Sequence, residues 1–158
     1  MSPVFFEWCE RTGVFQFIQL HEWAFPALET IHLFGLTLLL GSILVESLHL
    51  IGFLLPRQPT SELAMELSPY QHWGLALMLV SGAFMFVATA IRCYGNTSFR
   101  IKMVLLAVAL IFHFAYFRKL VRRTDSSVSR SSARLAAVSA TFVWFGVGMA
   151  GRAIGFLG

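Results

Sequence analysis

Charged residues are scarce in this chain. Only 13% of its 158 residues are charged, whereas about a quarter is usual for a soluble domain. Hydrophobic residues make up 57%, and they form long runs rather than the stripes of an amphipathic helix. Runs of this length predict membrane-spanning helices. The net charge of +4 does not indicate nucleic-acid binding, because half of the Lys and Arg residues lie in one short segment.

Cysteine is nearly absent as well. Cys9 and Cys93 are the two in the chain, which is too few for an iron–sulfur cluster or a zinc site built from thiolates. The first residues lack a basic region and a small-residue cleavage site, so no cleaved signal peptide is expected. No phosphate-binding loop, dinucleotide fingerprint or nucleophile–base pair is present, so hydrolase and kinase functions have no support.

Four apolar runs predict an all-α membrane protein with four transmembrane helices in a bundle. The predicted spans are residues 26–55, 70–92, 100–121 and 135–157. Proline is expected to open the first span at Pro26 and to end it at Pro56. Ser68 and Pro69 have the residue types of a helix cap and a first helical position, and we expect them to open the second span after a polar loop. Residues 118–134 are basic and serine-rich, which predicts a solvated loop.

Residues 1–25 precede this four-helix domain of residues 26–158. They mix aromatic and charged side chains and are too short and too charged to span a bilayer. We therefore expect an amphipathic segment in the membrane interface, in which Gly13 ends a first short helix.

The distribution of Lys and Arg predicts the orientation in the membrane. With the N-terminus outside, the inner side holds seven of these residues, six of them between Arg118 and Arg134, and the outer side holds five. Both termini are therefore expected on the outer side. Cys9 and Cys93 then share an oxidising side, where a disulfide is permitted, although we favour two unrelated thiols because pairing needs a close approach of the two Cα atoms.

The first predicted span contains one short pattern twice. Residues 29–35 and 46–52 both read Glu-x-x-His-x-x-Gly, and ionisable residues at membrane depth are candidates for function because they are costly there. Glu-x-x-His is also a ligand motif of di-iron proteins, which take the two copies from different helices. Here the two copies lie on one helix, about 25 Å and roughly 100° apart. The geometry therefore argues against a di-iron site.

Histidines are the main source of possible chemistry. His49, His72 and His113 are expected at similar depths toward the inner side, and two histidines from different helices can hold a b-type haem. Our preferred axial pair is His49 and His113, with His72 as the substitute and Arg118 near the haem propionates. The resulting hypothesis is a membrane-bound haem b protein that transfers electrons to or from quinone or a partner subunit.

His32 is expected in the outer half of the bundle, with Glu29 one turn before it. The cations and thioethers expected across the bundle at this depth are Lys102, Arg152, Met85, Met103 and Met149. Three sites are chemically possible here: a His/Met haem, a polar site built from Glu29, His32 and Arg152, and a copper site with imidazole and thioether ligands.

The same residues also fit a purely structural role. Their carboxylates and imidazoles can hydrogen-bond to neighbouring helices, and glycines such as those in Gly151–Gly155 let helices pack closely in lipid. On that interpretation the protein is a non-catalytic subunit that packs within a larger membrane complex or a homo-oligomer.

Several short strings spread over residues 32–156 carry a resemblance. They are Ile31-His32-Leu33-x-Gly35, Gly41-Ser42, Leu48-His49-Leu50-Ile51-Gly52, Phe99-Arg100-x-Lys102 and Gly151-Arg152-Ala153-Ile154. With these strings the chain resembles a family of small bacterial inner-membrane proteins. That family is loosely similar to the membrane domain of copper-resistance protein D and to small b-type cytochromes. The resemblance implies a four-helix fold in the bacterial inner (plasma) membrane and redox or metal traffic, without supplying a reaction.

Overall fold

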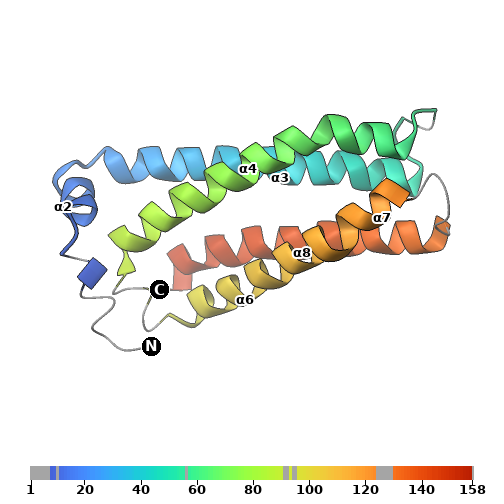
Figure 1. Ribbon diagram of the computed structural model, residues 1–158. Helices are drawn as coiled ribbons and strands as arrows, with labels where there is room; N and C mark the ends of the chain where they lie inside the picture. The colour runs from blue at the N-terminus through green and yellow to red at the C-terminus, as the bar shows by residue number, and fades with distance from the viewer. Residues whose placement is uncertain are drawn as a thin grey trace.

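The computed structural model describes residues 8–9, 11–55, 57–90, 93, 96–123 and 130–157. Within these residues, side chains are placed everywhere except at 122, 123, 130 and 152–157. All regular structure in the described part of the chain is helical. The helices are α2 (Gly13–Leu20), α3 (Ala24–Ile51), α4 (Thr60–Ala88), α6 (Thr97–Ile111), η1 (Phe112–Phe117), α7 (Arg118–Arg123) and α8 (Arg130–Leu157) (Figure 1).

In the described part of the chain, four helical stretches are long and apolar enough to cross a membrane. They are Ala24–Ile51, Thr60–Ala88, Thr97–Val121 and Ser131–Gly151. The prediction of an all-α, multi-pass membrane fold with four spans is therefore confirmed. The choice of the bacterial inner membrane and the sides on which the termini lie stay predictions.

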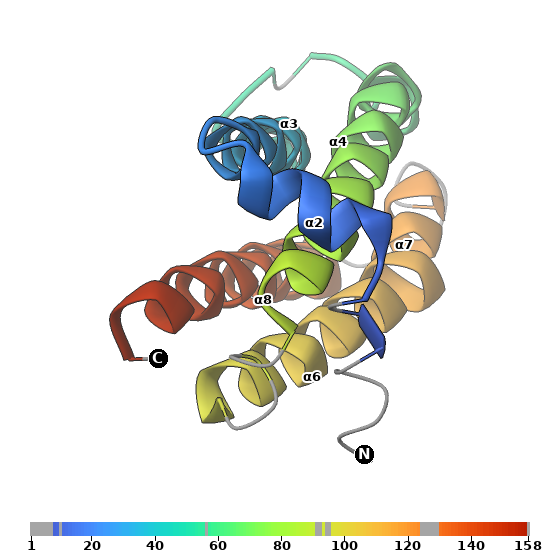
Figure 2. The ribbon, with the colours of Figure 1, turned by 90° about the vertical axis from the view of Figure 1, so that its left-hand side faces the viewer.

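The four long helices form a bundle, with α2 across one end (Figures 1 and 2). Helix α3 packs against α4 and α8, α8 also packs against α6, and α7 packs against α4. Helices α3 and α6 consequently lie diagonally opposite each other. We call the two ends of the bundle the α2 end and the α7 end, and the latter also holds the turn between α3 and α4.

The core of the bundle is apolar, and its largest fully buried side chains are Trp144 of α8 and Phe117 of η1. Leu39 and Ile43 of α3 pack in the same cluster. The fully buried small residues of α8 are Ala133, Ala136, Ala137 and Ala140. Small side chains let helices approach closely in lipid, where contact between helices depends on packing.

Helices α3 and α4 touch through their backbones at two glycines. A Cβ atom on Gly35 would lie 2.9 Å from the carbonyl oxygen of Gly74, and one on Gly74 would lie 2.7 Å from the backbone nitrogen of Leu39. Figure 1 shows α4 crossing α3 and then moving away from it toward the α2 end. The axes of the two helices therefore diverge toward the α2 end.

The end of α3 differs from the prediction. The helix ends at Ile51, and Gly52 follows with a φ of 90°. The backbone N–H of Gly52 donates to the carbonyl of His49, and that of Phe53 donates to the carbonyl of Leu48, both at 2.9 Å. This is the Schellman arrangement, which needs a left-handed residue that glycine adopts without strain. The predicted end at Pro56 was wrong because Gly52 ends the helix first.

The start of α4 was also predicted wrongly. Helix α4 begins at Thr60, so the polar residues Glu62 and Glu66 lie in its first turns, and Pro69 lies inside it. Proline removes one helix hydrogen bond, but transmembrane helices tolerate this loss where neighbouring groups satisfy the freed backbone. Pro69 therefore interrupts the hydrogen bonding without opening the helix.

The structure also differs from the predictions for two connecting segments. Thr12 caps α2 by accepting a hydrogen bond from the backbone N–H of Phe15 at 3.3 Å, so Gly13 opens a helix rather than ending one. The solvated loop predicted for residues 118–134 is helical up to Arg123 and again from Arg130, and residues 124–129 lie outside the described part. Residues 1–7 and 10 lie outside it too, and the interfacial location of residues 1–25 stays a prediction.

Cys9 and Cys93 are free and buried. Cys9 packs against Ala90, just after the end of α4, and the Cys93 sulfur lies 3.7 Å from the hydroxyl oxygen of Thr89. The disulfide that the sequence permitted is not formed in this structure.

Candidate functional site

The second histidine of the repeated pattern holds a turn together. His49 is buried at the end of α3, where its Nδ1 lies 3.1 Å from the carbonyl oxygen of Leu54 and its Nε2 lies 3.1 Å from the hydroxyl oxygen of Thr60. A carbonyl oxygen only accepts, so Nδ1 carries the proton and Nε2 accepts from Thr60. Both ring nitrogens are therefore engaged within the α3–α4 turn.

His72 connects α4 to α7. Its Nδ1 donates to the carbonyl oxygen of Ser68 at 2.6 Å, and its Nε2 accepts from Arg118 Nη1 at 2.9 Å. Arg118 also donates through Nη2 to the Ser68 hydroxyl at 3.0 Å, and its guanidinium lies over the Phe114 ring at 5.7 Å. Arg118, which the sequence placed near haem propionates, thus joins two helices in this structure.

His113 lies in the π-helical turn η1 and is only 2% exposed. Its ring centroid lies 5.9 Å from that of Phe117 and 6.1 Å from that of Trp144, and its Nδ1 has no hydrogen-bond partner. His113 packs against α8, whereas His49 belongs to the α3–α4 turn. The axial pair His49 and His113 stays a prediction that this arrangement does not favour, because both nitrogens of His49 already have partners.

His32 has one ring nitrogen engaged and one available. It is half-buried on α3, and its Nδ1 lies 3.0 Å from the hydroxyl oxygen of Ser81 on α4. The Ser81 hydroxyl donates its own proton to the Leu77 carbonyl, so its oxygen accepts from His32 Nδ1–H. This tautomer leaves a lone pair on Nε2. A histidine that donates from one nitrogen and offers the other is the usual arrangement of a metal-ligating imidazole.

Gly82 makes room for this ring. A Cβ atom at Gly82 would lie 3.2 Å from His32 Cε1, which is closer than almost all such contacts in proteins. The small residues of α4 that the sequence shows near this position therefore accommodate the imidazole of α3.

His32 lines a cavity of about 720 Å³ in the half of the bundle nearer the α2 end. Cofactor and ligand pockets typically measure roughly 300–1,000 Å³. Its walls come from α3, α4, α6 and α8, and they are mainly apolar. The apolar side chains of the lining include Leu33, Leu36, Leu79, Phe86, Leu106 and Val147. The cavity is thus suited to a largely apolar molecule.

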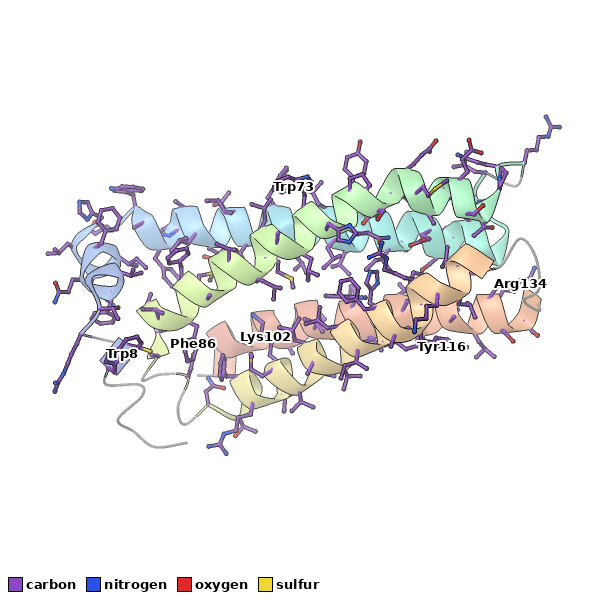
Figure 3. The ribbon with its side chains drawn as sticks, viewed as in Figure 1. Trp8, Trp73, Phe86, Lys102, Tyr116 and Arg134 are labelled. Atoms are coloured by element: carbon purple, nitrogen blue, oxygen red, sulfur yellow. The ribbon has the colours of Figure 1, made fainter. Side chains whose placement is uncertain are left out.

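Few polar groups line this cavity, and they come from two facing helices. Glu29 and His32 belong to α3, while Arg100 and Lys102 belong to α6. Figure 3 shows Lys102 and Phe86 in this half of the bundle. The thioethers of the lining are Met78, Met85 and Met103. Two cations, one carboxylate, one imidazole and soft sulfur ligands therefore line a single, mainly apolar cavity.

Lys102 occupies space that Gly151 leaves free. A Cβ atom at Gly151 would lie 3.2 Å from Lys102 Nζ, so this glycine accommodates a side chain of α6. The positive charge of Lys102 acts on His32. A second cation bound at His32 would be repelled by Lys102, whereas an anionic ligand would be attracted.

The residues predicted for the outer half are largely brought together. Glu29, His32, Lys102, Met85 and Met103 all line the cavity. Met149 does not line it and is 59% exposed on α8, and the side chain of Arg152 lies outside the described part. Gly35, the glycine of the same copy of the repeated pattern, lies at the α3–α4 crossing.

Sequence reasoning missed Met78 and Arg100 as members of this group. Met78 precedes Ser81 by about one helical turn and therefore shares its helix face, which is a local signal that could have been used. Arg100 stands two residues from Lys102, but only the tertiary structure brings it to the same cavity.

In the described part of the chain, no three His, Cys, Asp or Glu side chains gather at metal-binding distance. A metal ion coordinated at His32 would therefore need thioether ligands, or ligands that it brings with it.

Comparison with curated proteins and with solved structures finds no match for this chain. The expected similarity to copper-resistance protein D and to small b-type cytochromes is accordingly not shown. One family model covers nearly the whole chain, from residue 5 to residue 157. The chain belongs to this family, which is described as a family of unknown function, DUF6644.

Proposed function

We propose that the protein is a membrane-bound electron-transfer protein that holds haem b in the cavity near the α2 end, with His32 as an axial ligand. One observation supports this most: the imidazole with an available Nε2 lines the same apolar cavity of about 720 Å³ as two cations and three thioethers. When bound, haem supplies reversible one-electron chemistry, and the protein supplies its ligands and surroundings.

The two cations suit the charged edge of haem. Haem b is a flat apolar ring with two propionate carboxylates on one side, and its ferric form with ionised propionates is an anion. Arg100 and Lys102, both on α6, line the cavity and carry the positive charge that pairs with such carboxylates. The apolar lining surrounds the ring itself and excludes water from it.

The methionines could supply a further ligand to the iron. Helix α6 lies diagonally opposite α3, so Met103 of α6 is our choice for the residue that would hold the haem together with His32. Pairing methionine with histidine raises the reduction potential of a haem. Met78 and Met85 are on α4, next to α3, and are less suited to the opposite side.

Charge and size favour haem over a copper ion. Imidazole and thioether are good ligands for copper, but a bare cation would lie near both Lys102 and Arg100, with Glu29 as the one carboxylate of the described lining. A cavity of about 720 Å³ is also far larger than one ion requires. An anionic, mainly apolar cofactor suits both the positive charges of Lys102 and Arg100 and the size of the cavity.

The test is a dithionite-reduced minus oxidised spectrum of the purified protein, produced with ample haem, together with a pyridine haemochrome assay. We expect a b-type spectrum with about one haem per chain. The band should be lost in His32→Ala and kept in His49→Gln, a matched control that removes the other imidazole of the repeated pattern.

Two results would contradict the proposal. A flat spectrum from well-folded protein would exclude a haem protein, and copper found by metal analysis and lost in His32→Ala would then favour copper handling. A band that His113→Ala removes and His32→Ala retains would instead support the histidine pair predicted from the sequence.

A further inference from the structure

A second group of polar side chains lies inside the bundle, toward the α7 end and apart from the cavity. Glu46 of α3 and Gln71 of α4 are each only 4% exposed, and Gln71 Nε2 donates to Glu46 Oε2 at 2.7 Å. An ionised carboxylate in such a place needs a compensating charge, and otherwise it takes up a proton. A neutral amide stabilises the carboxylate without balancing its charge.

One cation acts on two buried titratable groups here. The charge of Arg118 interacts with Glu46 and with His113. Arg118 is held at the edge of this group by Ser68 and His72, and His72 is exposed. These residues therefore connect the buried groups to the surface of the bundle.

Among the residues that the structure describes, three buried polar side-chain atoms have no hydrogen-bond partner. They are the Ser47 hydroxyl oxygen of α3, His113 Nδ1 of η1 and Trp144 Nε1 of α8. Unpartnered buried polar atoms are rare in folded proteins, and an ordered internal water is a common explanation. The indole N–H only donates, so its partner must accept. Water both donates and accepts, and it would satisfy all three atoms.

The backbone around His113 is itself unusual. Residues Phe112–Phe117 form a π-helical turn within an otherwise α-helical span. Short π-helical segments occur frequently at functional sites. In this chain the turn contains His113, whose imidazole is buried beside Trp144.

We propose that this group is a proton-binding site that exchanges with the aqueous phase at the α7 end, with Glu46 as the residue that binds the proton. The proton passes from water near His72 and Arg118, through internal water held by Ser47, His113 and Trp144, to a carboxylate oxygen of Glu46. It leaves by the same route. The step forms and breaks only O–H bonds, and it needs no other reactant.

The charged groups near Glu46 and the buried apolar residues of the core surround this site. Arg118 of α7 is the charged group that acts on Glu46, and Arg118 and His72 act on His113 of η1, while α8 contributes only Arg134, which is exposed, among its described charged side chains. Leu39 is buried in the apolar core, and Met78, also buried there, lines the cavity. The site is therefore a binding site open at one end, and it does not rest on the proposed haem.

The proposal is tested by infrared difference spectra between acid and alkaline pH, recorded on the full chain in lipid nanodiscs. A protonated buried carboxyl shows a carbonyl stretching band that deuterated buffer shifts. We expect a reversible band that is absent in Glu46→Gln, which keeps the size and a polar partner for Gln71. The control Glu66→Gln changes an exposed carboxylate near the same end and should leave the band unchanged.

Two further variants keep the proposal testable if Glu46→Gln fails to fold. Arg118→Gln removes the nearby cation and should move the midpoint of the titration by about one pH unit or more. Ser68→Phe adds bulk beside Arg118 and should slow exchange of the band with deuterated buffer. A band that persists in Glu46→Gln, or one that does not change across the pH range in which the protein is folded, would overturn the proposal.

Discussion

The chemistry available to a histidine in this bundle depends on which of its ring nitrogens already has a partner. His32 and His49 occupy the same position in two copies of one pattern, and both donate from Nδ1. The difference is at Nε2, which accepts from Thr60 in the case of His49 and is available in the case of His32. A single hydroxyl group therefore separates a structural histidine from a candidate ligand.

At the same scale, we expect His49→Ala to destabilise the protein by about 1–3 kcal/mol, because it leaves the Leu54 carbonyl and the Thr60 hydroxyl without their partner. Thermal unfolding in detergent measures this loss. His49→Gln retains a donor and an acceptor and should lose less stability. If His49→Ala removed a haem band while the unfolding temperature stayed unchanged, His49 would be a ligand rather than a residue of the turn.

The arrangement of α3 and α4 creates the cavity. Their backbones meet at Gly35 and Gly74, and α4 moves away from α3 toward the α2 end (Figure 1). The space that results is completed by α6 and α8, which bring Lys102 and Gly151 to its far side. Small residues at one crossing thus control the shape of a site one to two turns away.

This element-level account predicts opposite effects for two glycine substitutions. Gly74→Ala would place a Cβ atom 2.7 Å from a backbone nitrogen of α3, and we expect a destabilisation of about 1–3 kcal/mol from overpacking. Gly41→Ala is the matched control, because a Cβ atom there meets nothing within 4 Å. It should be neutral, or stabilising by up to about 1 kcal/mol, since alanine favours helices.

Chemical unfolding in mixed detergent compares the two variants directly. Equal effects on the free energy of unfolding would mean that the helices do not touch at Gly35 and Gly74. If haem is bound as proposed, Gly74→Ala should also lower its occupancy, because the cavity begins at this crossing.

For the molecule as a whole, the segment before α3 closes the α2 end of the bundle. Helix α2 packs against both α3 and α4, and Cys9 packs against Ala90 (Figure 2). Cys93, between α4 and α6, is buried in the same region. Burial raises the pKa of the Cys93 thiol, so the thiolate form is populated only at higher pH than for an exposed cysteine.

Alkylation tests this closure. Because the thiolate is the reactive form, we expect both cysteines of the native protein to react slowly with a maleimide at neutral pH and to react fully after denaturation in detergent. For Cys93 the native rate should rise with pH only above the range of an ordinary thiol. Mass spectrometry after timed labelling measures both rates. Rapid labelling of native protein near neutral pH would show that the α2 end is open.

Local sequence alone determined the number of spans and the all-α class. A hydrophobic run long enough to cross a bilayer forms a helix there because no water is present to satisfy its backbone groups. The end of α3 is also encoded locally, in the left-handed conformation that Gly52 provides, rather than in the proline that follows it. Position along a helix predicts the common depth of Glu29, His32 and Lys102, although the polar site predicted there contained Arg152 in place of Lys102.

Only the tertiary structure decided which of these residues form a site. The depth of a side chain gives only its position along the bundle axis. Whether two side chains touch depends also on the rotation of each helix about its axis and on the angle at which the helices cross. Those are set by contacts between distant residues, such as Gly35 with Gly74 and Lys102 with Gly151. For this reason His49 and His113, at similar depths in the sequence, belong to different surroundings, while His32 and Lys102 line one cavity.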